Sequence, residues 1–304
     1  MCIVALAWNV LENMPICLLS NRDEFYERRS TKIKYWENSP IIAGQDLKSK
    51  GTWLGITATG RWAIITNYRD GLEKKTYTTS RGTLVEAFLT SDLTPIRFAQ
   101  YIEKIQHEYA GFNLIIGTNE QAVYMSNRGE APQVLANGIY ILSNGLLSDE
   151  WQKNNHLRKR FTQELIPVIA EQNHFDLAKS EQHTYKENEE KQLQAIVWDI
   201  LQDQRQVATD LLPNTGVAQD LEKVLSSTFI QSPHYGTKCS NFLRLIKTDH
   251  EALQWVWLEK TYKHSQIQNQ IQSQNDSEDQ SNCEDDSLSQ IKKIEQRINS
   301  PVAQ

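Results

Sequence analysis

The chain has 304 residues, of which 39% are apolar, and its formal net charge at pH 7 is −6. This length and apolar content suffice for one large domain or two small ones, each with its own core. The net acidity and the lack of a concentrated Lys/Arg cluster argue against a nucleic-acid or anionic-membrane partner. No apolar run approaches the roughly 20 residues that span a bilayer. We therefore expect a globular, cytoplasmic protein with no membrane span and no nucleic-acid partner.

The cysteines and histidines show no spacing typical of a metal site. The four cysteines, which form no CxxC or CxxCH motif, are Cys2, Cys17, Cys239 and Cys283. In a cytoplasmic protein they are expected to be reduced thiols. The opening apolar stretch lacks a basic leader and contains Asn9 and Glu12, so it predicts a strand rather than a signal peptide. We expect no metal and no required cofactor.

The first half of the chain predicts two groups of strands separated by two helices. Short β-branched and aromatic runs predict strands over 2–8, 16–20, 52–57 and 61–66, the last two joined in a hairpin through an Ala-Thr-Gly turn. Ser80, and Thr94 followed by Pro95, are typical helix starts and predict helices over 81–92 and 96–109. Further strands are predicted over 112–118, 122–127 and 138–144.

The second half changes to the period of a helix and then returns to strands. Helices are predicted over 151–172, 186–204 and 220–230, and strands over 238–247 and 252–262. Strands, paired helices, strands, helices and strands in this order favour an α+β fold with antiparallel sheets over a doubly wound parallel sheet.

The end of the chain differs in composition from the rest. From Ser265 to Gln304 there are seven Asp/Glu against three Lys/Arg, a net of −4, with few apolar side chains to offset the cost of ordering the backbone. We therefore predict two parts, a folded domain over 1–264 and an acidic, Gln/Ser-rich disordered tail over 265–304. A short amphipathic helix over the last IKKIEQRI is the alternative for that segment.

Polar and ionisable residues are concentrated directly after the predicted strand over 16–20. Four of them stand in series from Asn21 to Glu24, more than a turn needs. A hairpin of the first two strands would bring Arg22 and Asp23 beside Cys2. With Met1 removed, Cys2 would carry both a thiol nucleophile and an amine base. The alternative is an ordinary buried cysteine followed by a solvated loop.

A set of motifs in chain order resembles one known family. The motifs are MCI, NRDEFYERR, AG.D with GTWLGI, GR.A.ITNYRD, SRG.L...FL, GFNL, SNRGE, Y.LSN, W.K and YGTK, spread from residue 1 to about residue 240. Together they resemble the NRDE family, also called the transport and Golgi organisation 2 family. The resemblance implies the four-layer αββα sandwich of the N-terminal nucleophile (Ntn) hydrolases, with the nucleophile at the start of a strand.

The resemblance also implies roles for individual residues. It matches Cys2 to the nucleophile, Arg22 and Asp23 to the polar pair after the second strand, Asn67 and Asn144 to the oxyanion hole, and Lys238 to a late basic residue. Arg22 would favour the thiolate, and Asn67 would donate its amide to the developing oxyanion. Expected ligand contacts are Asn21, Phe25, Trp53 and Tyr68. Three positions depart from the usual pattern, namely Arg29, Gln45 and Lys238.

Three functions remain open at this stage. The first, implied by the resemblance, is binding or trafficking of a small molecule of the haem or acyl-lipid type, with haem as a transported ligand. The second is a Cys2-dependent amidohydrolase that acts on the C–N bond of a small linear amide. The third is an interaction module that uses the acidic tail. Fold alone does not decide among them, and whether the chain is an enzyme stays open.

Overall fold

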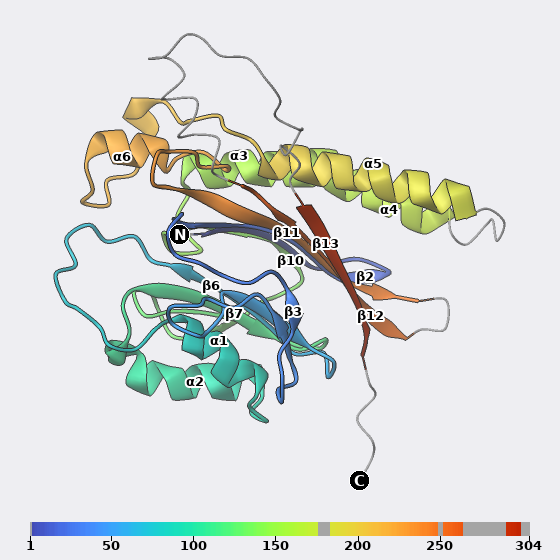
Figure 1. Cartoon of the computed structure of the whole chain (residues 1–304), viewed down its shortest axis with the longest axis horizontal. Helices are drawn as coiled ribbons and strands as arrows, with labels where there is room; N and C mark the ends of the chain where they lie inside the picture. Colours follow the sequence, from blue (N-terminus) through green and yellow to red (C-terminus); the bar gives the residue numbers. More distant parts are fainter. Residues whose placement is uncertain (1, 176–182, 249–251, 264–289, 299–304) are drawn as a thin grey trace, which may run out of the picture.

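Two antiparallel β-sheets pack face to face, and helices cover the outer face of each sheet (Figure 1). This computed structural model describes residues 2–175, 183–248, 252–263 and 290–298. The order of layers is helices, sheet, sheet, helices. The prediction of an α+β, four-layer αββα sandwich with antiparallel sheets is therefore confirmed.

The first sheet has six strands in the order β10-β1-β2-β11-β12-β13. These strands are β1 (Cys2–Leu11), β2 (Met14–Phe25), β10 (Gly138–Leu142), β11 (Tyr235–Lys247), β12 (Leu253–Thr261) and β13 (Gln290–Arg297). β2 is longer than predicted, because the polar NRDEF segment continues the strand instead of leaving it as a loop. The NRDEF motif is thus part of the sheet.

The second sheet has seven strands in chain order from β3 to β9. They are β3 (Lys34–Tyr35), β4 (Ile41–Ala43), β5 (Leu54–Thr57), β6 (Trp62–Asn67), β7 (Phe112–Gly117), β8 (Ala122–Ser126) and β9 (Gln133–Val134). The predicted β5–β6 hairpin is confirmed, and its Gly60 takes a positive φ of 84° that favours glycine. The three strands of this sheet that sequence patterns missed, β3, β4 and β9, have only two or three residues each.

Two groups of helices enclose the sheets (Figure 1). The second sheet is covered by α1 (Gly82–Leu89) and α2 (Pro95–Ile105), followed by η1 (Gln106–Glu108). The first sheet is covered by α3 (Gln152–Arg160), η2 (Phe161–Leu165), α4 (Ile166–Phe175) and α5 (His183–Leu201). Two short helices, η3 (Thr209–Leu211) and α6 (Gln219–Val224), precede β11. The helix predicted over 220–230 is shorter than expected, since its second half runs without regular structure into β11.

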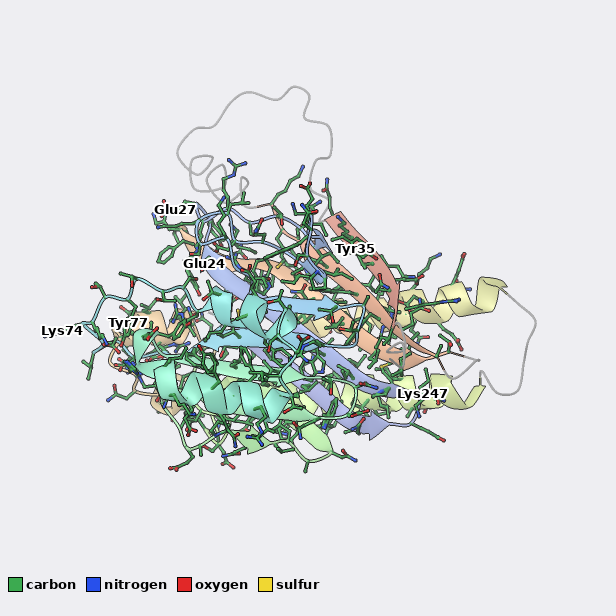
Figure 2. All side chains as sticks on the ribbon, turned by 90° about the horizontal axis from the view of Figure 1, so that it is seen from below. Glu24, Glu27, Tyr35, Lys74, Tyr77 and Lys247 are labelled. Atoms are coloured by element: carbon green, nitrogen blue, oxygen red, sulfur yellow. The ribbon has the colours of Figure 1, made fainter. Side chains whose placement is uncertain are left out.

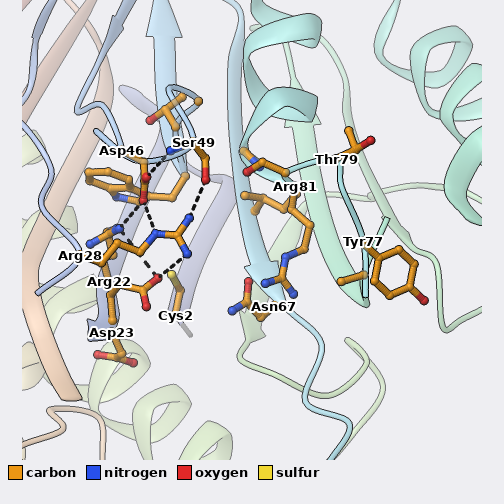
Figure 3. A pocket seen from close by; sticks show the side chains of 18 of the residues that line it. Cys2, Arg22, Asp23, Arg28, Asp46, Ser49, Asn67, Tyr77, Thr79 and Arg81 are labelled. Carbon is orange, nitrogen blue, oxygen red and sulfur yellow. Dashed lines mark hydrogen bonds and ion pairs between the residues drawn. The ribbon is translucent and has the colours of Figure 1, made fainter. Parts of the chain in front are cut away.

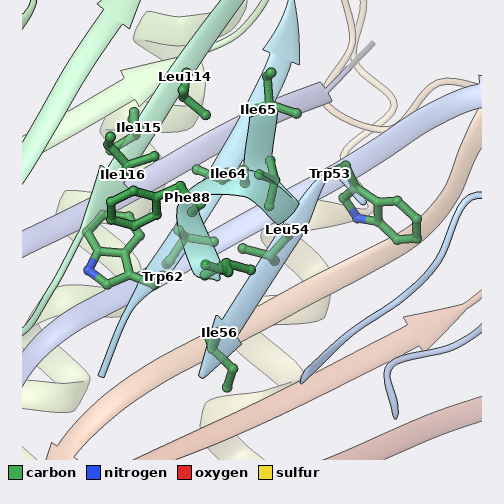
Figure 4. Packing of buried hydrophobic residues seen from close by; sticks show 14 of the residues in the cluster. Trp53, Leu54, Ile56, Trp62, Ile64, Ile65, Phe88, Leu114, Ile115 and Ile116 are labelled. Carbon is green, nitrogen blue, oxygen red and sulfur yellow. The ribbon is translucent and has the colours of Figure 1, made fainter. Parts of the chain in front are cut away.

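Strand β1 is buried on both faces, which explains its nearly continuous apolar sequence. Val4, Leu6 and Trp8 lie in the core between the sheets, whereas Ile3 and Ala5 lie in the core beneath the helices. Successive side chains of a strand point to opposite faces, so the even-numbered residues of β1 face the second sheet. Figure 4 shows the side chains that the second sheet and α1 bring to the core. Cys2, an even-numbered residue, consequently faces the layer between the sheets.

The last described segment corrects part of the predicted tail. Gln290–Arg297 is neither disordered nor helical but forms β13, paired antiparallel along the whole of β12. Ile294 is 7% exposed in the core between the sheets, while Ile291 is 47% exposed. The free edge of β12 offers a row of backbone partners that an isolated short helix lacks. Residues 264–289 and 299–304 lie outside the described residues, so disorder there stays a prediction.

Burial of Ile294 makes β13 part of the packed structure. We expect Ile294→Ala to lower the free energy of unfolding by about 2–4 kcal/mol, because a buried apolar side chain is lost and a cavity remains. Ile291→Ala, on the same strand and half-exposed, is the matched control and should change it by less than about 1 kcal/mol. Urea unfolding followed by circular dichroism measures both. Equal effects of the two substitutions would contradict the packing of β13.

A buried carboxyl group connects β12 to the loop before β3. Glu259 is 1% exposed, and its Oε1 accepts a hydrogen bond from the amide of Ile33 at 3.0 Å. Burial raises the pKa of Glu259 from its ordinary value of 4.5 to about 7. Between these two pH values the folded protein holds a proton that the unfolded chain has released, so stability falls as the pH rises through this window.

Replacing Glu259 should remove this pH dependence. Glu259→Gln keeps an oxygen acceptor for Ile33 but cannot ionise. As the pH rises from 4.5 to 8, the free energy of unfolding of the variant minus that of the wild type should increase by on the order of 3 kcal/mol. Urea unfolding at the two pH values tests this, with the exposed Glu12→Gln as control. Parallel pH profiles for the wild type and Glu259→Gln would refute it.

Candidate functional site

The register of the β1–β2 hairpin places Cys2 directly opposite Arg22. The predicted hairpin that returns the chain beside Cys2 is therefore confirmed. Residues paired in this way project from the same face of a sheet, so Cys2 and Arg22 both face the layer between the sheets. Cys2 is 7% exposed and Arg22 4% exposed. Burial raises the pKa of the Cys2 thiol above its ordinary value.

Cys2 borders a pocket of about 480 Å³ at one end of the layer between the sheets. This volume is in the range of small-molecule sites. Figure 3 shows Cys2, Arg22 and Asp46 on one side of it, and Asn67 and Arg81 on the other. Its Asp, Glu, Lys and Arg lining residues are Arg22, Asp23, Glu24, Arg28, Asp46, Lys75 and Arg81. Its aliphatic and indole lining comes from Trp53, Ile65 and Ala110, so the pocket is predominantly polar.

Arg22 is held between a carboxylate and an aromatic ring. Its Nη2 donates to Oδ2 of Asp46 at 3.1 Å, and its guanidinium carbon lies 4.4 Å from the centroid of the Trp53 ring. Arg28 donates to the same oxygen of Asp46 at 2.7 Å, and both arginines lie within 4 Å of Glu24. Two cations and two anions thus form one group of balanced charge beside Cys2.

Asp46 is the centre of that group and comes from the loop between β4 and β5. Its Oδ1 accepts hydrogen bonds from the amides of Lys48 and Ser49, which fixes the loop. Burial alone would raise the pKa of Asp46, but the Ser49 amide and Arg28 outweigh it and hold the pKa below its ordinary value. The carboxylate therefore stays ionised to accept both arginines.

Asp23 borders the same pocket, and its carboxylate is hydrogen-bonded to β11. Oδ1 accepts a hydrogen bond from Thr237 of β11 at 2.6 Å. Burial raises the pKa of Asp23, and the nearby charge of Lys153 opposes that rise. Lys153 is itself buried, donates to the carbonyl of Leu225 at 2.9 Å, and has its pKa lowered by burial to about 8. A second set of buried charges therefore lies behind Cys2.

The two asparagines matched to the oxyanion hole have different positions. Asn67 ends β6 and lines the pocket. Asn144 does not line it, because its Nδ2 donates to the carbonyl of Asn67 at 2.9 Å and its Oδ1 accepts from Arg69 at 3.5 Å. With its amide engaged on both sides, Asn144 holds the end of β6 in place, and Asn67 is the amide that faces the pocket.

Most of the other matched residues lie outside the pocket. Asn21 is fully buried and bonds to the carbonyls of Leu201 and Thr228, which joins β2 to the helical layer. Lys238 donates to the carbonyls of Tyr26 and Arg28. The remaining three positions are Phe25, exposed at the end of β2; Tyr68, in a second pocket of about 760 Å³; and Trp53, in the pocket itself.

Sequence reasoning did not single out several residues that the structure brings to or near Cys2. These are Arg28, Asp46, Lys75, Arg81 and, behind the pocket, Lys153. Arg28, Asp46, Arg81 and Lys153 belong to the motifs NRDEFYERR, AG.D, SRG and W.K, so the motifs themselves contained the signal. Among the described residues, no three His, Cys, Asp or Glu side chains gather as metal ligands would. No helix of the described chain is long and apolar enough to cross a membrane.

The fold and the pocket define a class of protein, an αββα sandwich whose first strand carries a cysteine between the two sheets. Within it, the chain belongs to the Transport and Golgi organisation 2 family, whose model matches residues 1–264. The resemblance to the NRDE family is thereby confirmed.

Individual relatives agree with this family. A Transport and Golgi organization 2 homolog of Mus musculus is 40% identical over 148 residues, which is 45% of this chain and 53% of the relative. The corresponding homolog of Homo sapiens is also 40% identical over 148 residues, with the same coverage. The chain spans about half the length of these curated relatives.

Two solved structures show a distant likeness in fold. One is a C2A mutant of the conjugated bile acid hydrolase from Clostridium perfringens, which is 8% identical to this chain with a TM-score of 0.37. The match covers 97% of this chain and 96% of the hydrolase. The other is a Caenorhabditis elegans N-acylethanolamine-hydrolyzing acid amidase ortholog, with 12% identity, a TM-score of 0.36, and coverage of 53% and 79%.

The charge group around Asp46 should matter for stability. Asp46→Asn keeps an oxygen for the loop amides but leaves Arg22 without its closest anion. We expect it to lower the free energy of unfolding by about 3 kcal/mol. The control is Glu73→Gln, which breaks an ion pair with Arg128 at the surface and should change stability much less. Chemical denaturation of both variants checks this, and a loss no larger in Asp46→Asn than in the control would count against it.

Proposed function

We propose that the chain is a cysteine-dependent hydrolase that cleaves the C–N bond of a small, polar amide. The observation that carries the proposal is that Cys2 borders a polar pocket of about 480 Å³ with Arg22 beside it and Asn67 across from it. Thiol, cation and amide donor are the groups that acyl transfer through a cysteine needs.

The residues divide the chemistry as follows. With Met1 removed, the amine of Cys2 takes the thiol proton, and the sulfur attacks the amide carbon. The carbonyl oxygen becomes negatively charged and accepts a hydrogen bond from Nδ2 of Asn67. The C–N bond then breaks, the amine leaves with the proton held by the Cys2 amine, and water hydrolyses the thioester. The positive charge of Arg22 favours the thiolate against the burial that raises the pKa of Cys2.

Substitution and mass spectrometry test this function together. The intact mass, with and without a thiol-reactive acylating probe, reports removal of Met1 and reactivity of Cys2. Cys2→Ala should abolish both the acyl adduct and turnover in a panel of small N-acyl amides. Asn67→Ala should lower kcat on the order of a hundredfold. Cys17→Ala is the control, since Cys17 is fully buried in the core beneath the helices and should affect neither.

Two results would exclude the hydrolase. One is a protein that has lost Met1 but forms no adduct at Cys2. The other is amide turnover that Cys2→Ala leaves unchanged.

A second candidate is binding and trafficking of a haem or acyl-lipid type ligand, without turnover. It is favoured by the burial of Cys2, which raises the pKa of the thiol and keeps it in the less nucleophilic neutral form. The polar lining of the pocket disfavours a large apolar ligand there. Neither His107 nor His234 nor His156 lines the pocket, which leaves Cys2 and Tyr77 as the haem-ligand candidates among the described residues that line it. A haem titration without a Soret shift would exclude haem.

The interaction module depends on the acidic tail, most of which lies outside the described residues. Within that tail, β13 packs on the folded domain. We propose a cytoplasmic location, as the charge and the cysteine content suggest.

A further inference from the structure

The charges of the pocket are unevenly distributed. On the side of Cys2, Arg22 and Arg28 are balanced by Asp46 and Glu24, all within ion-pair distance. On the opposite side the charged lining groups are Arg81 and Lys75. Among the described residues, the only carboxylate contact is that of Glu73, which accepts a hydrogen bond from the backbone amide of Lys75 at 3.2 Å, and no ion pair joins a carboxylate to the Arg81 guanidinium or the Lys75 ammonium. Two positive side chains therefore line this side of the pocket without an ion-pair partner among the described residues.

Arg81 is placed to reach a ligand bound at Cys2. It is the N-cap residue of α1, and its guanidinium points toward Asn67 (Figure 3). The hydrogen bond that its side chain makes among the described residues goes to the carbonyl of Gly111 at 2.9 Å, which leaves most of its five N–H donors for a ligand. Burial lowers the pKa of Arg81, and the charge of Glu24 across the pocket opposes that fall only in part.

Arg22 also has a buried hydrogen-bond donor without an acceptor among the described residues. Its Nη1 is buried and has no hydrogen-bond partner among the described residues, although its Nη2 is bonded to Asp46. A buried, unsatisfied guanidinium nitrogen is costly. Since Arg22 lines the same pocket, an acceptor atom of the ligand would satisfy Nη1.

Lys75 lies on the long loop 68–81 that borders the pocket. Its ammonium donates to the carbonyl of His107 at 3.2 Å and lies 4.8 Å from the Tyr77 ring centroid. Figure 2 shows the neighbouring Lys74 together with Tyr77 at one end of the molecule. The loop 68–81 is held to the rest of the molecule by hydrogen bonds, such as that from the amide of Gly71 to the carbonyl of Thr215 at 2.7 Å. Lys75 thus adds positive charge at the rim.

We propose that Arg81 and Lys75 bind an oxyanion of the ligand, a carboxylate or a phosphate, so that the ligand is a small amide carrying an anionic group on the side away from Cys2. Arg81 forms the direct pair, because its planar fork matches the oxygens of either anion. Lys75 attracts the anion from the rim. This inference rests on the proposed function, since it assigns a ligand class to the same pocket, and the experiments below separate the two.

Binding of small probes to the full chain tests the anion site without any chemistry at Cys2. Isothermal titration with succinate, inorganic phosphate and the neutral succinamide should show binding of at least one anion and none of succinamide. The anion that binds tells a carboxylate from a phosphate. Arg81→Gln should weaken that binding by about tenfold or more, and Lys75→Gln by a smaller factor. Added salt should weaken it as well.

The matched control is Arg61→Gln. Like Arg81, Arg61 is a half-buried arginine that donates to backbone carbonyls, those of Phe88 and Leu93, but it lies outside the pocket. Its substitution should leave anion binding unchanged. The proposal is overturned if neither anion binds, or if Arg81→Gln binds as the wild type does. Should Arg81→Gln fail to fold, the anion titration is made on Lys75→Gln, which changes an exposed side chain. Anion binding equal to that of the wild type would then overturn the proposal.

A pair of alkylating reagents shows whether the anion site lies beside Cys2. The anionic iodoacetate should label Cys2 faster, relative to the neutral iodoacetamide, in the folded protein than in the urea-unfolded protein. Arg81→Gln should bring that ratio toward the unfolded value, and a ratio that does not respond contradicts the placement. If neither reagent labels Cys2, the proposed function fails, while the titrations still decide the anion site.

Discussion

The antiparallel pairing of β1 with β2 determines the position of every group around Cys2. Both faces of β1 are covered, and its large Leu6 and Trp8 face the second sheet while its small Ala5 and Ala7 face the helices. Exchanging these two sets of side chains would disrupt the packing of both cores, so packing holds one register. A shift by one residue would turn Cys2 from the layer between the sheets into the helical layer. The core that stabilises the protein is thus also what places the thiol opposite Arg22.

The same alternation separates two neighbouring residues of the motif. Arg22 faces the pocket and the Asp46 loop, whereas Asp23 bonds to Thr237. One strand therefore organises two sets of charges, with Asp46 and Glu24 on one side and Lys153 on the other. Neither set would be stable as isolated charges in a protein interior, where an unpaired ion is costly. The order of the layers and the balance of these charges depend on each other.

Much of the fold could be predicted from the sequence, because long amphipathic or doubly buried segments carry a strong periodic signal. The hairpin of β1 and β2, which places Arg22 opposite Cys2, was predictable for the same reason. The continuation of β2 through NRDEF was not, since charged residues in a strand make sense only once Asp46, far along the chain, accepts Arg22. Asn144 shows the complementary difficulty, because a motif position does not reveal that its amide holds Asn67 instead of facing the pocket.

Strand β13 has a consequence for how the boundary of the domain is understood. The family model ends at residue 264, yet the first sheet continues through Gln290–Arg297. A chain cut at the family boundary would leave the whole of β12 as a bare edge with unpaired amides and carbonyls. Such an edge readily pairs with other chains and promotes aggregation. Solubility of the part of the chain that the family model matches would then depend on a segment that the family definition does not contain.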